Sequence, residues 1–204
     1  MKKTLALTLL AASLFAFIRP AAQITYQVDT HQSKVVWKGK KVTGEHAGNV
    51  SLTAGSLVVA DGKLKGGSFE TDLRTLTVTD LTDKDYNAKL VGHLKGDDFF
   101  AVEKHPVSKF VITRVAPQSG DQVTISGKLT IKGITQEISF PATVKADASK
   151  LTASAKIPVD RTKFDIKYRS ANFFENLGDK AISNDFELDV TLVAPAASGA
   201  QARK

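Results

Sequence analysis

The sequence predicts an all-β fold, an eight-stranded antiparallel barrel with one short lid helix over about residues 83–95. Beyond residue 24 most of the chain alternates apolar and polar residues with a period of two, which is typical of half-buried strands. The segment near residues 82–96 has helical periodicity instead. One amphipathic helix among strands favours a lid on a barrel, although a β-sandwich gives similar cues and stays an alternative.

Residues 1–22 are predicted to be a signal peptide. Two lysines precede an apolar run, Leu5 to Ile18, whose length suits a signal-peptide core and is short for a transmembrane helix. Cleavage is expected after Ala22, and an uncleaved leader that tethers the protein to a membrane is the alternative. The chain has no cysteine, so we expect neither a disulfide nor a lipid-modified cysteine. A periplasmic or secreted protein is therefore predicted.

A single domain over residues 23–194 follows from the alternation. Strands are expected at residues 24–29, 34–38, 44–54, 56–60, 63–79, 109–115, 122–131, 134–144, 151–159 and 186–192. Asp61-Gly62 and Lys132-Gly133 predict tight turns between strands. Gly66-Gly67 predicts a bulge or sharp bend. Residues 195–204 are small and polar, and they predict a disordered tail.

The helix is expected from its apolar stripe and its end signals. The stripe is formed by Tyr86, Leu90, Val91 and Leu94, spaced as on one face of a helix. Thr82 with Asp85 resembles a capping box, and Gly96 stands where a C-terminal cap is expected.

Charge and motifs argue against several classes of function. The formal net charge is +7, but the basic residues are scattered, with no aromatic-interleaved track, so nucleic-acid binding is not expected. Nucleophile elbows, phosphate-binding glycine loops and metal-binding histidine pairs are absent from the sequence. His46 beside Glu45, and His93 with Asp97, could meet around a metal, although ordinary turn histidines are the commoner explanation. We therefore expect no enzyme, no metal and no cofactor.

Two phenylalanine pairs lie in polar, irregular segments. They are Phe99-Phe100 and Phe173-Phe174. Pairs of this kind either plug the end of a barrel core or line the mouth of a pocket, and both interpretations stay open.

Five segments together resemble the YceI-like family of exported bacterial proteins, over about residues 24–193. They are Tyr26-Gln-Val-Asp-Thr-His-Gln-Ser-Lys-Val-Val-Trp37, His46-Ala-Gly48, His93-Leu-Lys-Gly-Asp-Asp-Phe-Phe100 with Lys104-His-Pro106, Gly127-Lys-Leu-Thr-Ile-Lys-Gly-Ile-Thr135, and Asp160-Arg-Thr-Lys-Phe-Asp-Ile166. The resemblance implies an extended lipocalin-like barrel whose lumen holds a long-chain amphiphile, a polyprenyl lipid or isoprenoid quinone. It also implies a homodimer, and transient membrane contact would accompany such a ligand.

Candidate ligand-binding residues follow from the pattern of apolar side chains. We expect Trp37, Phe69, Phe110 and Phe140 on strands, with Leu90 and Leu94 on the helix, to line the lumen. Phe99, Phe100, Phe173 and Phe174 would guard its mouth, and His46, Asp97 and Arg169 are the candidates for the polar head group.

The competing hypothesis is an exported stress or interaction protein whose barrel is filled by its own side chains and holds no lipid. The small residues Gly127, Ala153 and Ala155 favour spare room inside the barrel over this alternative. A third hypothesis, an enzyme acting on a lipid-sized substrate, needs a polar constellation in the lumen, and the alternating strands offer none.

Overall fold

Antiparallel strands form more than half of the computed structural model, which describes residues 23–146 and 149–196. These residues contain nine strands: β1 (Gln23–Gln27), β2 (Lys34–Lys41), β3 (Gly44–Ala60), β4 (Lys63–Asp72), β5 (Val107–Pro117), β6 (Gln122–Ile131), β7 (Ile134–Ala146), β8 (Lys150–Asp160) and β9 (Ile182–Pro195). The helical elements among them are α1 (Lys84–Lys95) and the 3-10 turns η1 (Leu73–Thr75), η2 (Arg161–Phe164) and η3 (Gly178–Lys180).

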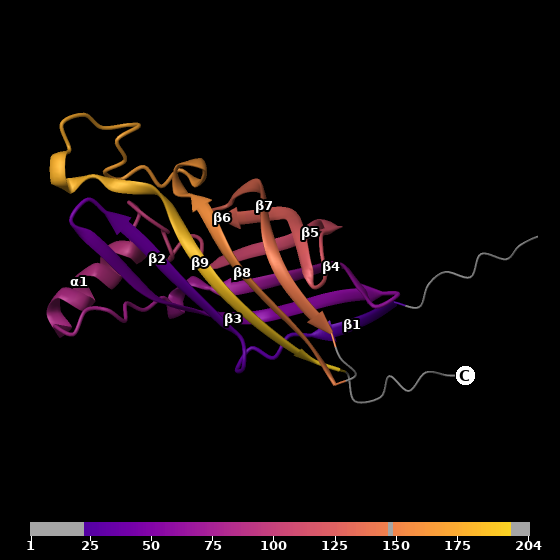
Figure 1. Cartoon of the computed structure of the whole chain (residues 1–204). Helices are drawn as coiled ribbons and strands as arrows, with labels where there is room; N and C mark the ends of the chain where they lie inside the picture. Colours follow the sequence, from indigo (N-terminus) through magenta and orange to yellow (C-terminus); the bar gives the residue numbers. More distant parts are fainter. Residues whose placement is uncertain (1–22, 147–148, 197–204) are drawn as a thin grey trace, which may run out of the picture.

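The sheet closes on itself as a barrel (Figure 1). The strand order is β1-β3-β2-β9-β8-β7-β6-β5-β4, and β4 pairs back onto β3. Strands β1 and β2 pair with successive parts of β3, residues 56–60 and 44–50 respectively, so they share one position in the wall. The predicted eight-stranded antiparallel barrel with one helix is therefore confirmed, and a sandwich is excluded.

Strand β3 is a single strand of 17 residues, whereas the sequence suggested two. Its ladder with β4 shifts register between Leu52 and Ala54, and such an irregularity lets a long strand bend around a barrel. The expected turn at Asp61-Gly62 is present, with φ of 52° and 68°. Next to the expected irregularity at Gly66-Gly67, the ladder shifts between Val58 and Val59.

Strand β4 ends at Asp72, seven residues before the predicted end at 79. The chain turns through η1 and then crosses the end of the barrel as the crossing segment, residues 76–80. Thr77 N–H donates to Asn49 O at 3.0 Å, and Thr79 N–H donates to Ala47 O at 2.9 Å. Leu76 and Val78 are buried while Thr77 and Thr79 are exposed, so the alternation continues although the regular ladder does not.

Helix α1 begins one residue later than the capping box suggested. Asp83, and not Thr82, is the N-cap: its carboxylate accepts from the N–H groups of Asp85 and Tyr86, both at 3.0 Å. Gly96 is the C-terminal cap, as expected. Leu94 is buried, but Tyr86 is 66% exposed and does not belong to the buried stripe.

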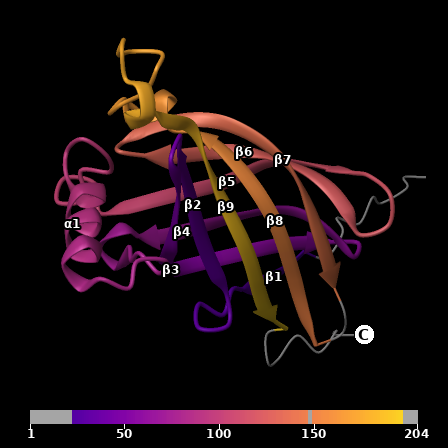
Figure 2. The same ribbon diagram turned by 60° about the vertical axis from the view of Figure 1, so that its left-hand side comes forward.

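The two ends of the barrel differ. Helix α1 and the loop of residues 165–181 lie at one end, which we call the helix end, in both views (Figures 1 and 2). The far end carries the start of β1 and the end of β9, and Leu57, Val59, Leu151 and Ala194 pack there with at most 5% exposure.

Two predicted segments fall largely outside the described residues. The expected signal peptide, residues 1–22, lies entirely outside them. Of the expected tail, residues 195–204, only the first two are described: β9 runs to Pro195, and the Ala196 N–H donates to Ser149 O at 2.8 Å.

One ladder of the wall stops short. Strands β7 and β8 pair only over Ala142–Ala146 and Leu151–Ala155, so residues 134–141 and 156–160 diverge toward the helix end. We call this gap the β7–β8 seam. The segment after β8 lies beside this gap, because the Gln136 side chain of β7 donates to Lys163 O at 3.1 Å, and Phe164 and Ile166 of that segment are buried in the core, each 1% exposed.

Candidate functional site

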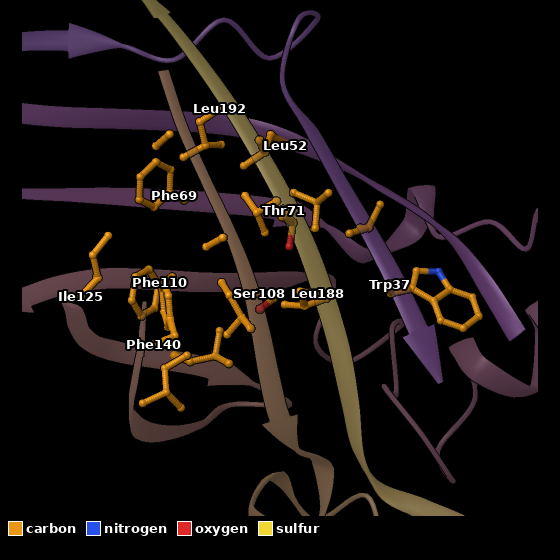
Figure 3. Close-up of a pocket in the computed structure, with 18 of the residues that line it drawn as sticks. Trp37, Leu52, Phe69, Thr71, Ser108, Phe110, Ile125, Phe140, Leu188 and Leu192 are labelled. Atoms are coloured by element: carbon orange, nitrogen blue, oxygen red, sulfur yellow. The ribbon is translucent and has the colours of Figure 1, made fainter. Parts of the chain in front are cut away.

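The barrel encloses a cavity of about 150 Å³ (Figure 3). Most of its wall is formed by alternate residues of the strands, such as Phe110 and Ile112 on β5 and Leu188, Val190 and Leu192 on β9, and Leu73, Leu76 and Phe100 contribute from outside the strands. No charged side chain lines it among the residues that the structure describes; the polar side chains in the lining, apart from the Trp37 indole, belong to Thr71, Ser108 and Ser154. The cavity therefore offers apolar contact and no charge.

Aromatic rings occupy one side of this cavity. Phe69 and Phe110 stack with centroids 6.5 Å apart, and Phe110 lies 5.6 Å from Phe140. Figure 3 shows the three rings gathered near Ile125. A Cβ on Gly127 would lie 2.5 Å from Cζ of Phe110, so the ring fills the space over this glycine. Gly127 thus supplies no spare room, contrary to expectation, whereas Ala153 and Ala155 do line the cavity.

Three half-buried rings line the helix-end side of the cavity, and we call them the rim. They are Trp37 on β2, Phe100 after α1 and Phe186 on β9. Phe100 and Phe186 meet edge to face, with centroids 6.3 Å apart. The Trp37 indole Nε1 donates to Thr77 O at 3.1 Å, which joins the rim to the crossing segment.

The predicted lumen and mouth residues separate into three groups. Trp37, Phe69, Phe100, Phe110 and Phe140 line the cavity. Leu90, Leu94 and Phe99 belong to the hydrophobic core without lining the cavity, and Phe173 and Phe174 are exposed by 50% and 48% on the loop outside. As ligand contacts, all ten residues remain predictions.

Strand β9 supplies lining that the sequence reasoning did not assign to the site. Phe186, Leu188, Val190 and Leu192 all face the cavity. Their strict alternation was the available signal, but periodicity alone does not say which face of a strand turns inward.

The three head-group candidates do not come together, and none of them lines the cavity. His46 Nδ1 lies 2.8 Å from Asp80 Oδ2. Asp97 forms an ion pair with Lys104 at 2.9 Å, and the Arg169 guanidinium stands 5.1 Å from the centre of the Tyr168 ring. Each side chain already has a protein partner, so a common polar site for a head group is not preformed.

Asp80 fastens the end of the crossing segment to β3. Its carboxylate accepts from the Ala47 N–H at 2.8 Å and lies against His46. Partial burial alone would raise the pKa of Asp80, but the hydrogen bonds from Ala47 and His46 outweigh it and hold that pKa below its ordinary value. The ionised carboxylate is thus the form that this contact favours.

His93 joins α1 to the loop of residues 165–181. Its Nε2 lies 3.0 Å from Asp98 Oδ2, and not beside Asp97. Its ring meets Phe99 and Tyr168 edge to face at 5.0 and 4.7 Å. Among the described residues, no group of three or more His, Cys, Asp or Glu side chains could hold a metal ion.

A closed barrel around an apolar cavity defines a class of protein that binds apolar molecules in its interior. The family model of the YceI-like domain matches residues 26–194 of this chain. The chain therefore belongs to the YceI-like family. Proteins of this family bind ligands and are not enzymes.

Relatives agree with this assignment. A UPF0312 protein of Shewanella denitrificans is 32% identical over 155 residues, which is 72% of this chain and 73% of the relative. A second UPF0312 protein, from Photorhabdus laumondii, is 26% identical over 48% of this chain and 50% of its own length.

Solved structures share the fold. BcnA of Burkholderia cenocepacia superposes with a TM-score of 0.66 at 24% identity, covering 82% of this chain and 99% of BcnA. A polyisoprenoid binding domain from Saccharophagus degradans superposes with a TM-score of 0.61 at 13% identity, covering 84% of this chain and 98% of that domain.

Proposed function

We propose that the protein binds a long-chain isoprenoid lipid, a polyprenyl or isoprenoid quinone-like amphiphile, in the barrel cavity and carries or stores it outside the cytoplasm. The observation that carries this proposal is the cavity lining, which is predominantly apolar on strands β2 to β9 and free of charged side chains within the described residues. The likeness to a polyisoprenoid binding domain supports the ligand class.

Energetics favour an apolar chain in such a cavity. Each methylene removed from water contributes about 0.8 kcal/mol, so a chain of about twenty carbons gains roughly 15 kcal/mol before costs. Ordering the chain and restricting its motion offset much of this gain. Because the lining carries no charge, the prenyl chain occupies the cavity and a polar head group stays at the rim or outside.

The proposed location rests on the leader expected over residues 1–22, with cleavage after Ala22. Within the described part of the chain, no helix has the length and apolar character needed to cross a bilayer. The homodimer and the transient membrane contact are part of the same proposal.

A second candidate function is favoured by the size of the cavity. A volume of about 150 Å³ is comparable to one that holds a benzene-sized molecule, so a long chain needs the interior to expand. If the interior does not expand, the cavity is too small for a long-chain lipid. The protein would then be an exported stress or interaction protein without a lipid ligand.

Mass spectrometry separates the two candidates. The full chain is expressed, isolated from the exported fraction without detergent, and weighed first under native and then under denaturing conditions. The lipid carrier shows an added mass that extracts into organic solvent as a prenyl chain, and the native mass also reports a monomer or a dimer. Protein that is apo and stays apo after incubation with isoprenoid quinones would establish the filled barrel.

A matched pair of variants locates the ligand. Ala155→Leu adds bulk to the cavity wall and is expected to lower lipid occupancy. Glu137→Leu places the same side chain at an exposed position on β7 and is expected to leave occupancy unchanged. Equal occupancy in both variants would show that the lipid binds elsewhere.

A further inference from the structure

Two large apolar side chains are exposed side by side at the helix end. Phe173 and Phe174 are 50% and 48% exposed on the loop of residues 165–181. Val42, at the tip between β2 and β3, is 65% exposed, and its N–H donates to Ala181 O at 3.2 Å, at the base of this loop. We call Val42, Phe173 and Phe174 the apolar tip.

The loop that carries the two phenylalanines is built around buried polar contacts. Ser170 is completely buried, and its hydroxyl pairs with Asn184 Oδ1 at 2.6 Å. The N–H groups of Phe173 and Phe174 both donate to Ser170 O at 3.0 Å. The backbone at Phe173 and Phe174 is therefore held in a defined turn, and this turn leaves both residues half exposed.

The base of the loop is fixed as firmly. Arg161 is 4% exposed, and its guanidinium donates to the backbone carbonyls of Ile166, Ile182 and Ser183 at 2.8 to 3.0 Å. The Ile182 N–H also donates to Arg169 O at 2.9 Å. A firmly anchored loop that presents two phenylalanines to water indicates a surface with a partner.

Cations accompany the apolar tip. Lys167 Nζ lies 5.2 Å from the Phe173 ring centre, and Lys40 and Lys41 precede Val42. Within the loop the basic side chains are matched by Asp165, Glu175 and Asp179, so the basic excess comes from the β2–β3 tip. Aromatic rings with lysines beside them are the composition of segments that lie at a membrane–water interface.

We propose that the helix end docks on the surface of a phospholipid bilayer, with Phe173 and Phe174 inserted among the head groups and Val42 beside them. The loop protrudes from the barrel (Figures 1 and 2), and a protruding tip enters a fluid interface more readily than it matches a flat protein surface. Two half-exposed phenylalanines bury far less than the roughly 1,200 Å² of a stable protein interface.

Docking in this orientation adds to the proposed function, and its biological role rests on that proposed function. The rim rings Trp37, Phe100 and Phe186 lie on the helix-end side of the cavity, so they would face the membrane that supplies or receives the lipid. The far end, packed with buried side chains, would face the aqueous phase.

Flotation with vesicles tests the proposal. Purified protein is mixed with vesicles of phosphatidylcholine and phosphatidylglycerol that contain no isoprenoid. We expect the wild type to float with the vesicles and the Phe173→Ser/Phe174→Ser variant to partition about tenfold more weakly, because two apolar side chains lose their burial. Ile24→Ser removes an apolar residue that is 40% exposed on β1, at the far end, and should float like the wild type.

Three outcomes would overturn the docking proposal. They are a wild type that does not float, a double variant that floats as well as the wild type, and a native mass that changes from dimer in the wild type to monomer in the double variant. The last outcome would assign the apolar tip to contact between copies of the chain. Because the vesicles lack isoprenoid, flotation does not depend on binding in the cavity. Cavity binding is tested separately, by measuring whether isoprenoid lipid copurifies with the double variant when it is purified without detergent.

Discussion

The indole of Trp37 donates a hydrogen bond to the carbonyl oxygen of Thr77 at 3.1 Å, directly over Gly48. Trp37 and Gly48 are partners in the ladder between β2 and β3. A Cβ on Gly48 would lie 1.8 Å from Thr77 O and 2.7 Å from the indole nitrogen. The missing side chain is what allows the crossing segment to lie against the barrel and receive this hydrogen bond.

Gly48→Ala is expected to destabilise the protein. The added methyl group has to displace backbone rather than a flexible side chain, and overpacking of this kind costs about 1–3 kcal/mol. Gly92→Ala is the matched control, because a Cβ at that position of α1 meets no atom within 4 Å and alanine favours a helix by about 1 kcal/mol over glycine. Denaturant unfolding measures both; equal stability of the two variants would contradict the close contact.

Asp80→Ala should loosen the crossing segment. The Ala47 N–H and the His46 ring lose their acceptor, at a cost of about 1–2 kcal/mol. Asp121→Ala, at an exposed turn, should stay within about 0.5 kcal/mol of the wild type.

Acid should remove the contribution of Asp80. Because the pKa of Asp80 is lowered in the folded state, the stabilisation is complete above the ordinary value of 3.8 and is lost as the pH falls through the folded-state pKa. The difference in unfolding free energy between wild type and Asp80→Asn should therefore shrink as the pH is lowered from neutrality to below 3.8. A difference that is constant across this range would show that ionisation of Asp80 contributes nothing.

Arg161→Met should release the loop of residues 165–181. Three backbone carbonyls lose a charged donor in a buried site, and we expect a loss of about 3 kcal/mol. Limited proteolysis should then cut within the loop before the barrel strands. Arg114→Met, at an exposed position of β5, should leave both readouts unchanged, and an intact loop in Arg161→Met would contradict the role of this guanidinium.

Leu94→Ala should weaken the packing of α1 on the barrel. Leu94 is 9% exposed, and truncating a buried leucine costs about 2–5 kcal/mol. Tyr86 on the same helix is 66% exposed, so Tyr86→Ala is expected to change the unfolding free energy by about 0.5 kcal/mol or less. A larger effect at Tyr86 than at Leu94 would mean that the helix buries a different face.

Period-two alternation located most of the strands and supported the eight-stranded barrel, although it divided β3 into two strands. Gly62 correctly marked a turn, because its φ of 68° lies in the region that favours glycine. Gly96 correctly marked the end of α1, where it is the C-terminal cap. Alternation misplaced the end of β4, since Leu76 and Val78 stay buried and Thr77 and Thr79 stay exposed after the ladder has ended.

The candidate site was harder to predict than the fold. The two phenylalanine pairs have the same composition, yet Phe99 is buried beside His93, Phe100 lies at the rim, and Phe173 and Phe174 face solvent. These differences depend on tertiary contacts, such as the buried hydroxyl of Ser170, that no local pattern reports. Tertiary contacts also separate the head-group candidates: His46 contacts Asp80, Asp97 pairs with Lys104, and Arg169 lies over the Tyr168 ring.

The β7–β8 seam has a consequence for how the interior can change volume. In a fully laddered barrel, widening the lumen breaks backbone hydrogen bonds between strands. Here residues 134–141 and 156–160 hold no ladder bonds to each other, so separating them along this line costs side-chain contacts such as the bond from Gln136 to Lys163 O and no ladder hydrogen bond. The β7–β8 seam is therefore the part of the wall where widening the cavity, about 150 Å³ in this structure, would break the fewest backbone hydrogen bonds.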